Sequence, residues 1–181
     1  MKLFLYKIIH LFYKSLPFGD ILNSSFSAVF KLFFFQKLLG FNRKVNWQVH
    51  WSSSVLEPRK IKRGKNFRAS SKNVYLDGRN GIVFGENVWI GPSVKIISQN
   101  HDLLNFTEYQ TTNPIKIGSN SWIGGGAIIL PDVVLGDHTV VGAGAVVTKS
   151  FPLKNQVIAG NPAKKIKKIP NYGSIKKQNN K

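Results

Sequence analysis

The chain has 181 residues, of which 43% are hydrophobic, so its length suits one domain with a short appendage and its composition suffices for a core. It contains no cysteine, which excludes a disulfide framework, a thiolate nucleophile and a cysteine metal site, and which agrees with a cytoplasmic protein. With 26 basic and 8 acidic residues the net charge is +18, which favours anionic partners, although a solvated lysine-rich surface is an equal alternative.

The first segment, residues 1–45, differs from the rest of the chain. Residues 2–14 are apolar and aromatic with interleaved lysines, and a second such stretch covers residues 26–39. Neither has about twenty uninterrupted apolar residues, so neither predicts a transmembrane span, and no signal-peptide cleavage site follows. We expect two short helices, which either lie in a membrane interface or cap the structure that follows.

A repeat of six residues organises the second segment, residues 46–168. Aliphatic residues recur at this interval at Ile117, Ile123, Ile129, Leu135, Val141 and Val147, usually with a small residue after them. The same phase continues upstream at Phe84, Ile90 and Ile96, and more loosely at Val49, Val55, Ile61 and Phe67. A period of six fits neither an α-helix nor a plain strand. It predicts an all-β hexapeptide-repeat solenoid, a parallel β-helix whose three-sided coils contain about eighteen residues each.

Two irregularities interrupt the repeat. The count slips near residues 77–81, which resemble a turn, and the interval between Ile96 and Ile117 is not a multiple of six. Residues 98–114 must therefore leave the prism as an extended loop, and such loops often carry binding and catalytic residues. Residues 169–181 are expected to form a flexible basic tail.

His101 begins this loop and is the most promising of the four histidines. Imidazole titrates near neutrality and can take a proton from an alcohol as the alcohol attacks. The alternative is an ordinary surface histidine, which is what we expect of His138 at a corner of the regular coils.

A set of short motifs follows in order. They are Asn100-His101, Pro114-Ile115-Lys116-Ile117-Gly118, Trp122-Ile123-Gly124, Ile129-Leu130-Pro131, Val141-Gly142-Ala143-Gly144-Ala145-Val146-Val147-Thr148-Lys149 and Gly160-Asn161-Pro162-Ala163. The set resembles the hexapeptide-repeat acetyltransferases, closest to the maltose and galactoside type and to the O-acetyltransferases of bacterial surface polysaccharides. The resemblance implies a left-handed winding, a homotrimer with active sites between neighbouring prisms, acetyl-CoA as donor, and no metal.

The resemblance also implies roles for individual residues. His101 would be the general base of a direct transfer, with Asn100 beside it and one of Asp102, Glu86 or Glu108 orienting its ring. Positions expected to contact the donor are Trp122 near the thioester, Gly125 and Ala143 along the pantetheine arm, Thr148 and Lys149 at its end, and Lys164 and Lys167 near the phosphates. Ser71, Asp102 and Tyr109 are expected to contact the acceptor. Ser71 replaces an asparagine that the maltose-type enzymes carry thirty residues before the histidine.

These features predict an acetyl-CoA-dependent O-acetyltransferase that modifies a sugar hydroxyl of a bacterial surface polysaccharide (capsule, O-antigen or exopolysaccharide) or its precursor. The alternatives are a xenobiotic O-acetyltransferase and a non-catalytic basic membrane-binding module. A carbonic anhydrase of the same fold is disfavoured, because it needs three histidines at matching coil spacing. We expect a cytoplasmic protein with peripheral contact to the inner membrane and no nucleic-acid partner.

Overall fold

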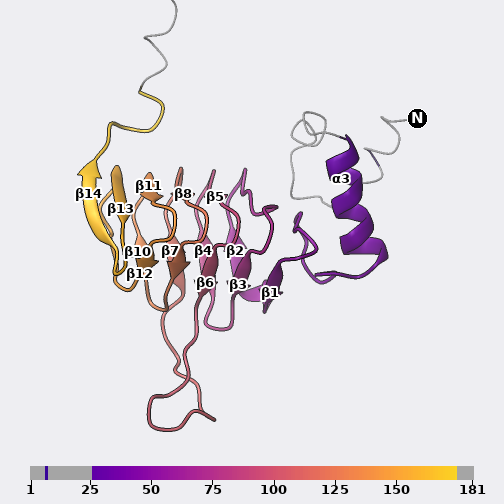
Figure 1. Ribbon diagram of the computed structural model, residues 1–181, viewed down its shortest axis with the longest axis horizontal. Coiled ribbons are helices and arrows are strands. Elements are labelled where there is room, and N and C mark those ends of the chain that lie inside the picture. The colour runs from indigo at the N-terminus through magenta and orange to yellow at the C-terminus, as the bar shows by residue number, and fades with distance from the viewer. Residues whose placement is uncertain (1–6, 8–25, 175–181) are drawn as a thin grey trace, which may run out of the picture.

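The computed structural model describes residue 7 and residues 26–174, and shows a three-sided parallel β-helix (Figure 1). Its strands are β1 (Ser54–Leu56), β2 (Ile61–Arg63), β3 (Tyr75–Asp77), β4 (Ile82–Phe84), β5 (Trp89–Ile90), β6 (Lys95–Ile97), β7 (Ile115–Ile117), β8 (Trp122–Ile123), β9 (Ile128–Ile129), β10 (Val134–Leu135), β11 (Thr139–Val141), β12 (Val146–Val147), β13 (Gln156–Ala159) and β14 (Lys164–Lys168). The prediction of an all-β parallel β-helix is confirmed.

Each side of the prism is one sheet. Side A contains β1, β3, β6, β9 and β12, side B contains β2, β4, β7 and β10, and side C contains β5, β8, β11, β13 and β14. Neighbouring strands are parallel, except that β13 and β14 are antiparallel. The chain passes from side C to A to B in each coil, and we name the edges of the prism C–A, A–B and B–C accordingly.

The aliphatic residues of the repeat fill the interior. All six positions of the regular block are buried, at 2% exposure or less. This follows from parallel pairing in register, which stacks equivalent residues of successive coils on one another, as in the Ile96–Ile129 pair. Removing this apolar surface from water is the main stabilising term of such a fold.

In the early block Val49, Ile61 and Phe67 are buried and Val55 is partly buried, but two of the four residues are out of the predicted register. Ile61 pairs with Ile82, two residues before Phe84. The cause is the edge before β2, where Glu57 adopts a left-handed φ of +46° and a 3₁₀ turn (η2, Pro58–Lys60) follows. Likewise Arg68 pairs with Trp89, which aligns Phe67 with Val88 rather than with Ile90. Even spacing of hydrophobic residues therefore predicts burial here, but not register.

Glycines at the edges bring successive coils close together. A Cβ at Gly124 would lie 2.7 Å from both the Ala143 nitrogen and the Val141 oxygen, whereas a Cβ at Gly125 would come no closer than 3.3 Å to the Pro92 oxygen. Only the first is a distance that real Cβ atoms do not show, so the backbone itself would have to move.

We expect Gly124→Ala to destabilise the protein by about 1–3 kcal/mol, the usual cost of overpacking. Thermal unfolding should show a fall of about 2–4 °C in the midpoint for each kcal/mol in a chain of this size. Gly125→Ala is the matched control and should leave the midpoint nearly unchanged. Equal midpoints for the two variants would contradict the close approach of the coils.

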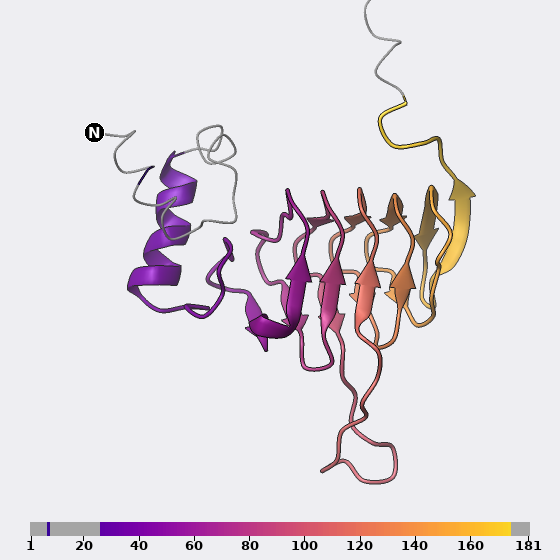
Figure 2. The same cartoon turned by 180° about the vertical axis from the view of Figure 1, so that it is seen from behind.

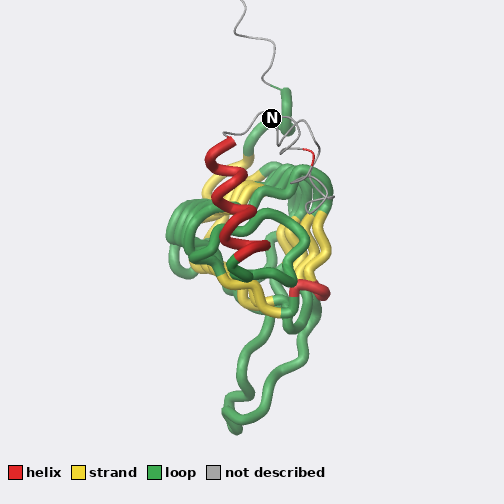
Figure 3. Tube along the Cα trace, turned by 90° about the vertical axis from the view of Figure 1, so that its right-hand side faces the viewer, coloured by secondary structure: helices red, strands yellow, loops and turns green. Residues whose placement is uncertain are grey.

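The N-terminal end of the prism is covered by α3 (Phe26–Phe33), which continues as a π-helical turn (η1, Phe34–Leu38) and crosses that end in Figure 3. Buried Gln36 donates from Nε2 to the carbonyls of Val45 and Trp47, at 3.0 and 2.8 Å. A helix is therefore present within the predicted stretch 26–39, and through Gln36 it holds Val45 and Trp47, which pack in the core. The helix predicted for 2–14 lies outside the described residues, apart from residue 7.

At the other end, β14 reverses direction and pairs with β13 along the edge of side C. Its four lysines are exposed, and charged edge strands resist pairing with further strands. Within the described part of the chain, no helix has the length and apolar character that crossing a membrane requires.

Candidate active site

Residues 98–114 form the expected loop, which leaves the A–B edge between β6 and β7 and extends well away from the prism (Figure 2). Its base is held by side chains. Asn80 donates from Nδ2 to the Gln110 carbonyl at 2.8 Å and to Thr112 Oγ1 at 3.1 Å. Ser98 Oγ accepts from the backbone N–H of Asn80 at 2.9 Å. The loop therefore departs from a fixed base.

The exposed His101 imidazole is held by this loop. Its Nδ1 lies 2.6 Å from the carbonyl oxygen of Phe106, and its ring packs on Tyr109 with centroids 4.6 Å apart. Because a carbonyl oxygen only accepts, Nδ1 must carry the proton in this hydrogen bond. In the neutral ring Nε2 then has a free lone pair, as a general base requires.

A backbone carbonyl therefore has the orienting role that the sequence suggested for a carboxylate. Asp102 Oδ1 accepts from the amides of Leu104 and Asn105 at 2.8 and 3.1 Å, so this carboxylate stabilises the turn of the loop. Glu86 lies at the B–C edge, away from the loop. Among the described residues, no hydrogen bond or ion pair joins the His101 ring to any of the three carboxylates.

Tyr109 is supported from the prism by an ion pair between the buried Asp77 carboxylate and the partly exposed Arg79 guanidinium. Asp77, at 0% exposure, accepts from Arg79 Nε and Nη2 at 3.0 and 2.8 Å. This hydrogen bonding to Asp77 raises the pKa of Arg79. The Arg79 guanidinium lies 5.4 Å from the centre of the Tyr109 ring. A chain of contacts thus leads from the buried carboxylate to the ring that packs on His101.

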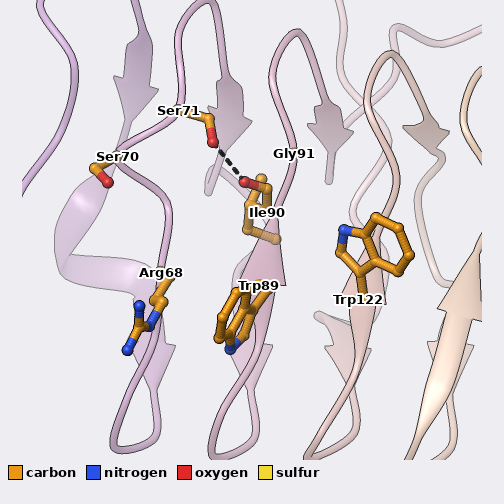
Figure 4. A pocket seen from close by; sticks show the side chains of 7 residues that line it. All are labelled: Arg68, Ser70, Ser71, Trp89, Ile90, Gly91 and Trp122. Atoms are coloured by element: carbon orange, nitrogen blue, oxygen red, sulfur yellow. Dashed lines mark hydrogen bonds between the residues drawn. The ribbon is translucent and has the colours of Figure 1, made fainter.

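A pocket of about 300 Å³ lies on side C, where the chain turns toward side A (Figure 4). It is lined by Arg68, Ser70, Ser71, Trp89, Ile90, Gly91 and Trp122. Ser71 donates from Oγ to the Ile90 carbonyl at 2.8 Å, and the Trp122 ring is 56% exposed. The structure thus brings together two predicted site residues, Ser71 and Trp122, and adds Arg68 and Trp89, which the sequence analysis did not single out.

The other residues predicted to contact the acyl donor, acetyl-CoA, lie on different edges of the prism. Gly125 and Ala143 occupy the C–A edge on adjacent coils, and the Gly125 carbonyl accepts from the amide of Gly144 at 2.9 Å. Thr148 and Lys149 follow β12 at the A–B edge, the edge from which the His101 loop also departs. One chain therefore does not bring His101 and Asn100 next to Trp122.

The basic C-terminal region forms a groove that the sequence did not predict. Because β14 folds back antiparallel, Lys165 and Lys168 join Lys154 around a groove of about 530 Å³. The predicted phosphate contacts Lys164 and Lys167 are on the same strand but do not line this groove. The described residues contain no cluster of three or more potential metal ligands.

The repeat itself has known counterparts. Residues 114–149 match the family described as bacterial transferase hexapeptide (six repeats). The chain contains the repeat module of the hexapeptide transferases. This match covers the most regular coils, from β7 to the end of β12, and confirms the resemblance inferred from the motifs.

Relatives of this module are named as acetyltransferases. A Dictyostelium discoideum protein named as a candidate acetyltransferase is 51% identical over 111 residues, which are 59% of this chain and 57% of that protein. The structure is similar to a maltose O-acetyltransferase of Clostridium difficile 630 (39% identity, TM-score 0.57, 63% of this chain and 62% of that one). It is also similar to a galactoside acetyltransferase in complex with coenzyme A (30% identity, TM-score 0.55, 66% and 63%). The chain thus spans less than two thirds of the length of each of these proteins.

Proposed function

We propose that this protein is an acetyl-CoA-dependent O-acetyltransferase with a sugar acceptor. The observation that carries the proposal is the His101 ring, whose Nδ1 is bound to the Phe106 carbonyl so that Nε2 can accept a proton. The relatives support it, because they are named for acetyl transfer to maltose or galactosides, and one is a complex with coenzyme A.

In the proposed reaction His101 Nε2 takes the proton from an acceptor hydroxyl as its oxygen attacks the thioester carbonyl carbon. The carbon–sulfur bond then breaks, and the imidazolium returns its proton to the leaving thiolate, so that the products are an acetyl ester and free CoA. The chain has no cysteine for an acyl-enzyme, in keeping with direct transfer. General-base assistance of this kind contributes about 10²–10⁴-fold in rate.

The active site of this proposal is shared between chains of a homotrimer. His101 departs from the A–B edge, whereas Trp122, Gly125 and Ala143 lie on side C and at the C–A edge. Packing the A–B edge of one prism beside side C of the next would bring both groups to one cleft, and threefold symmetry closes such an interface. Light scattering of the purified protein should give the mass of three chains.

The acceptor that we propose is a bacterial surface polysaccharide or its precursor, met at the inner face of the cytoplasmic membrane. The net charge of +18 supports an anionic setting of this kind. Mass spectrometry of the surface polysaccharide from cells with and without the gene tests the assignment. Loss of one acetyl group per modified sugar is expected, and an unchanged polysaccharide would contradict it.

Peripheral membrane contact is proposed for residues 38–44, at the end of η1 and directly after it. Leu38, Leu39 and Phe41 are 69%, 51% and 48% exposed, and Arg43 and Lys44 lie beside them in the chain. Apolar side chains next to cationic ones suit an anionic lipid surface.

Replacing Leu38, Leu39 and Phe41 together by serine should weaken sedimentation with phosphatidylglycerol vesicles by about tenfold or more, since each apolar side chain contributes to insertion. The control Leu153→Ser/Ile166→Ser removes two equally exposed apolar residues from the other end of the prism and should bind as the wild type does. Unchanged sedimentation of the triple variant would remove this part of the proposal.

A further inference from the structure

The pocket on side C has a pattern that the proposed reaction does not by itself explain. Arg68, Trp89 and Trp122 occupy equivalent positions on three successive coils, because Arg68 pairs with Trp89 and Trp89 pairs with Trp122 (Figure 4). The Arg68 guanidinium lies over the Trp89 ring, 4.6 Å from its centre. The stacking orders a long cationic side chain that would otherwise be mobile.

Among the described residues that line the pocket, Arg68 is the only charged one. Across the described residues a single ion pair is present, between Arg79 and Asp77, so the Arg68 guanidinium is not neutralised by a carboxylate. When the flat face of a guanidinium stacks on an aromatic ring, the N–H groups of the guanidinium still point outward in its own plane. There they can bind a carboxylate or phosphate in bidentate fashion.

The rest of the pocket suits a sugar. Trp89 and Trp122 are 47% and 56% exposed, and the apolar C–H face of a pyranose can bury such aromatic surface. Ser70 and Ser71 add hydroxyl groups to the wall. A volume of about 300 Å³ is at the lower end of the range for small-molecule sites and fits one monosaccharide unit rather than a large ligand.

We propose that this pocket is an acceptor subsite for an anionic pyranose, in which Arg68 binds the carboxylate or phosphate and Trp89 packs against the ring. The proposal rests on the proposed acetyltransferase function and specifies its substrate class. Trp122 forms the wall toward the coils that carry Gly125 and Ala143, so the subsite adjoins the region expected to hold the thioester.

Direct binding of three ligands tests the subsite. Methyl β-glucuronide, glucose 6-phosphate and methyl β-glucoside are titrated by calorimetry into the full-length protein without acetyl-CoA. An anionic sugar should bind about tenfold or more tightly than the neutral glucoside, as expected for a charge-assisted hydrogen bond. Arg68→Gln should remove this preference, and Trp89→Ala should weaken all binding. Lys62→Gln, which removes one positive charge from side B, should change nothing.

A preference for the glucuronide identifies a carboxylate, and a preference for the sugar phosphate identifies a phosphate. Equal affinity for the neutral sugar, a preference that survives in Arg68→Gln, or no binding of any of the three would overturn the subsite. The proposed function is judged separately. If the wild type and Arg68→Gln acetylate neutral glycans at equal rates, the proposed acetyltransferase function stands and the proposed subsite falls. If anionic sugars bind preferentially but no acetyl transfer is detected, the subsite stands and the proposed function falls.

Discussion

Replacement of His101 by alanine is expected to lower kcat for acetyl transfer by about 10²–10⁴-fold, the contribution of a positioned general base. The affinity for acetyl-CoA should stay near that of the wild type, because the imidazole is needed for the proton and not for holding the donor. Steady-state kinetics with separate variation of donor and acceptor measures both effects. Free imidazole in the buffer should restore part of the lost rate.

His138→Ala is the matched control for this experiment. His138 lies at the B–C edge of the regular coils, where Nδ1 is 2.9 Å from Asn155 Oδ1 and the ring contacts Tyr172. Its removal should leave kcat unchanged. Wild-type turnover by His101→Ala with an accepted substrate would contradict the assignment of the base, and an equal loss in both variants would indicate a general loss of structure.

Arg79→Ala is expected to destabilise the protein by about 1–3 kcal/mol, because it leaves the buried Asp77 carboxylate without its charged partner, whereas the Arg79 side chain itself is partly exposed to solvent. The unfolding midpoint should fall by about 2–4 °C for each kcal/mol. Activity should fall as well, since the guanidinium also lies over Tyr109, which packs on His101. Thermal unfolding and kcat of the same preparation measure the two effects.

The double variant Asp77→Leu/Arg79→Leu separates stability from positioning. Replacing both partners removes the unpaired charge and should recover much of the stability, but it should not recover kcat, because Tyr109 still lacks its cation. Arg59→Ala, an exposed arginine near the same sheet, controls for loss of charge alone. Full recovery of kcat in the double variant would show that Arg79 does not position the loop.

The sequence predicted the fold because parallel coils stack equivalent residues and make the period visible. Ile117, Ile123 and Ile129 are buried as their spacing required. The period became unreliable where an edge changed length, as at the 3₁₀ turn before Ile61, since an edge conformation shifts register without changing which residues are apolar.

The candidate site was only partly predictable. The interval between Ile96 and Ile117 located the loop and His101. The hydrogen-bond partner of the His101 ring is the backbone carbonyl of Phe106. Because every residue has a backbone carbonyl, this partner could not be predicted from residue types. The basic groove depends on the reversal of β14, which the run of lysines did not reveal. The Arg68–Trp89 contact joins two coils whose alignment was obscured by the edge between them, where residues 70–73 contain one residue more than the equivalent residues 91–93.

The most direct measurement of the central claim is a rapid-quench single turnover with labelled acetyl-CoA, in which protein and acceptor masses are both determined. The label should appear on an acceptor oxygen at the rate at which CoA is released, with none on the protein, and it should do so only when His101 is present. Label that accumulates on the protein, or that reaches the acceptor equally fast in His101→Ala, would contradict direct transfer with His101 as the base.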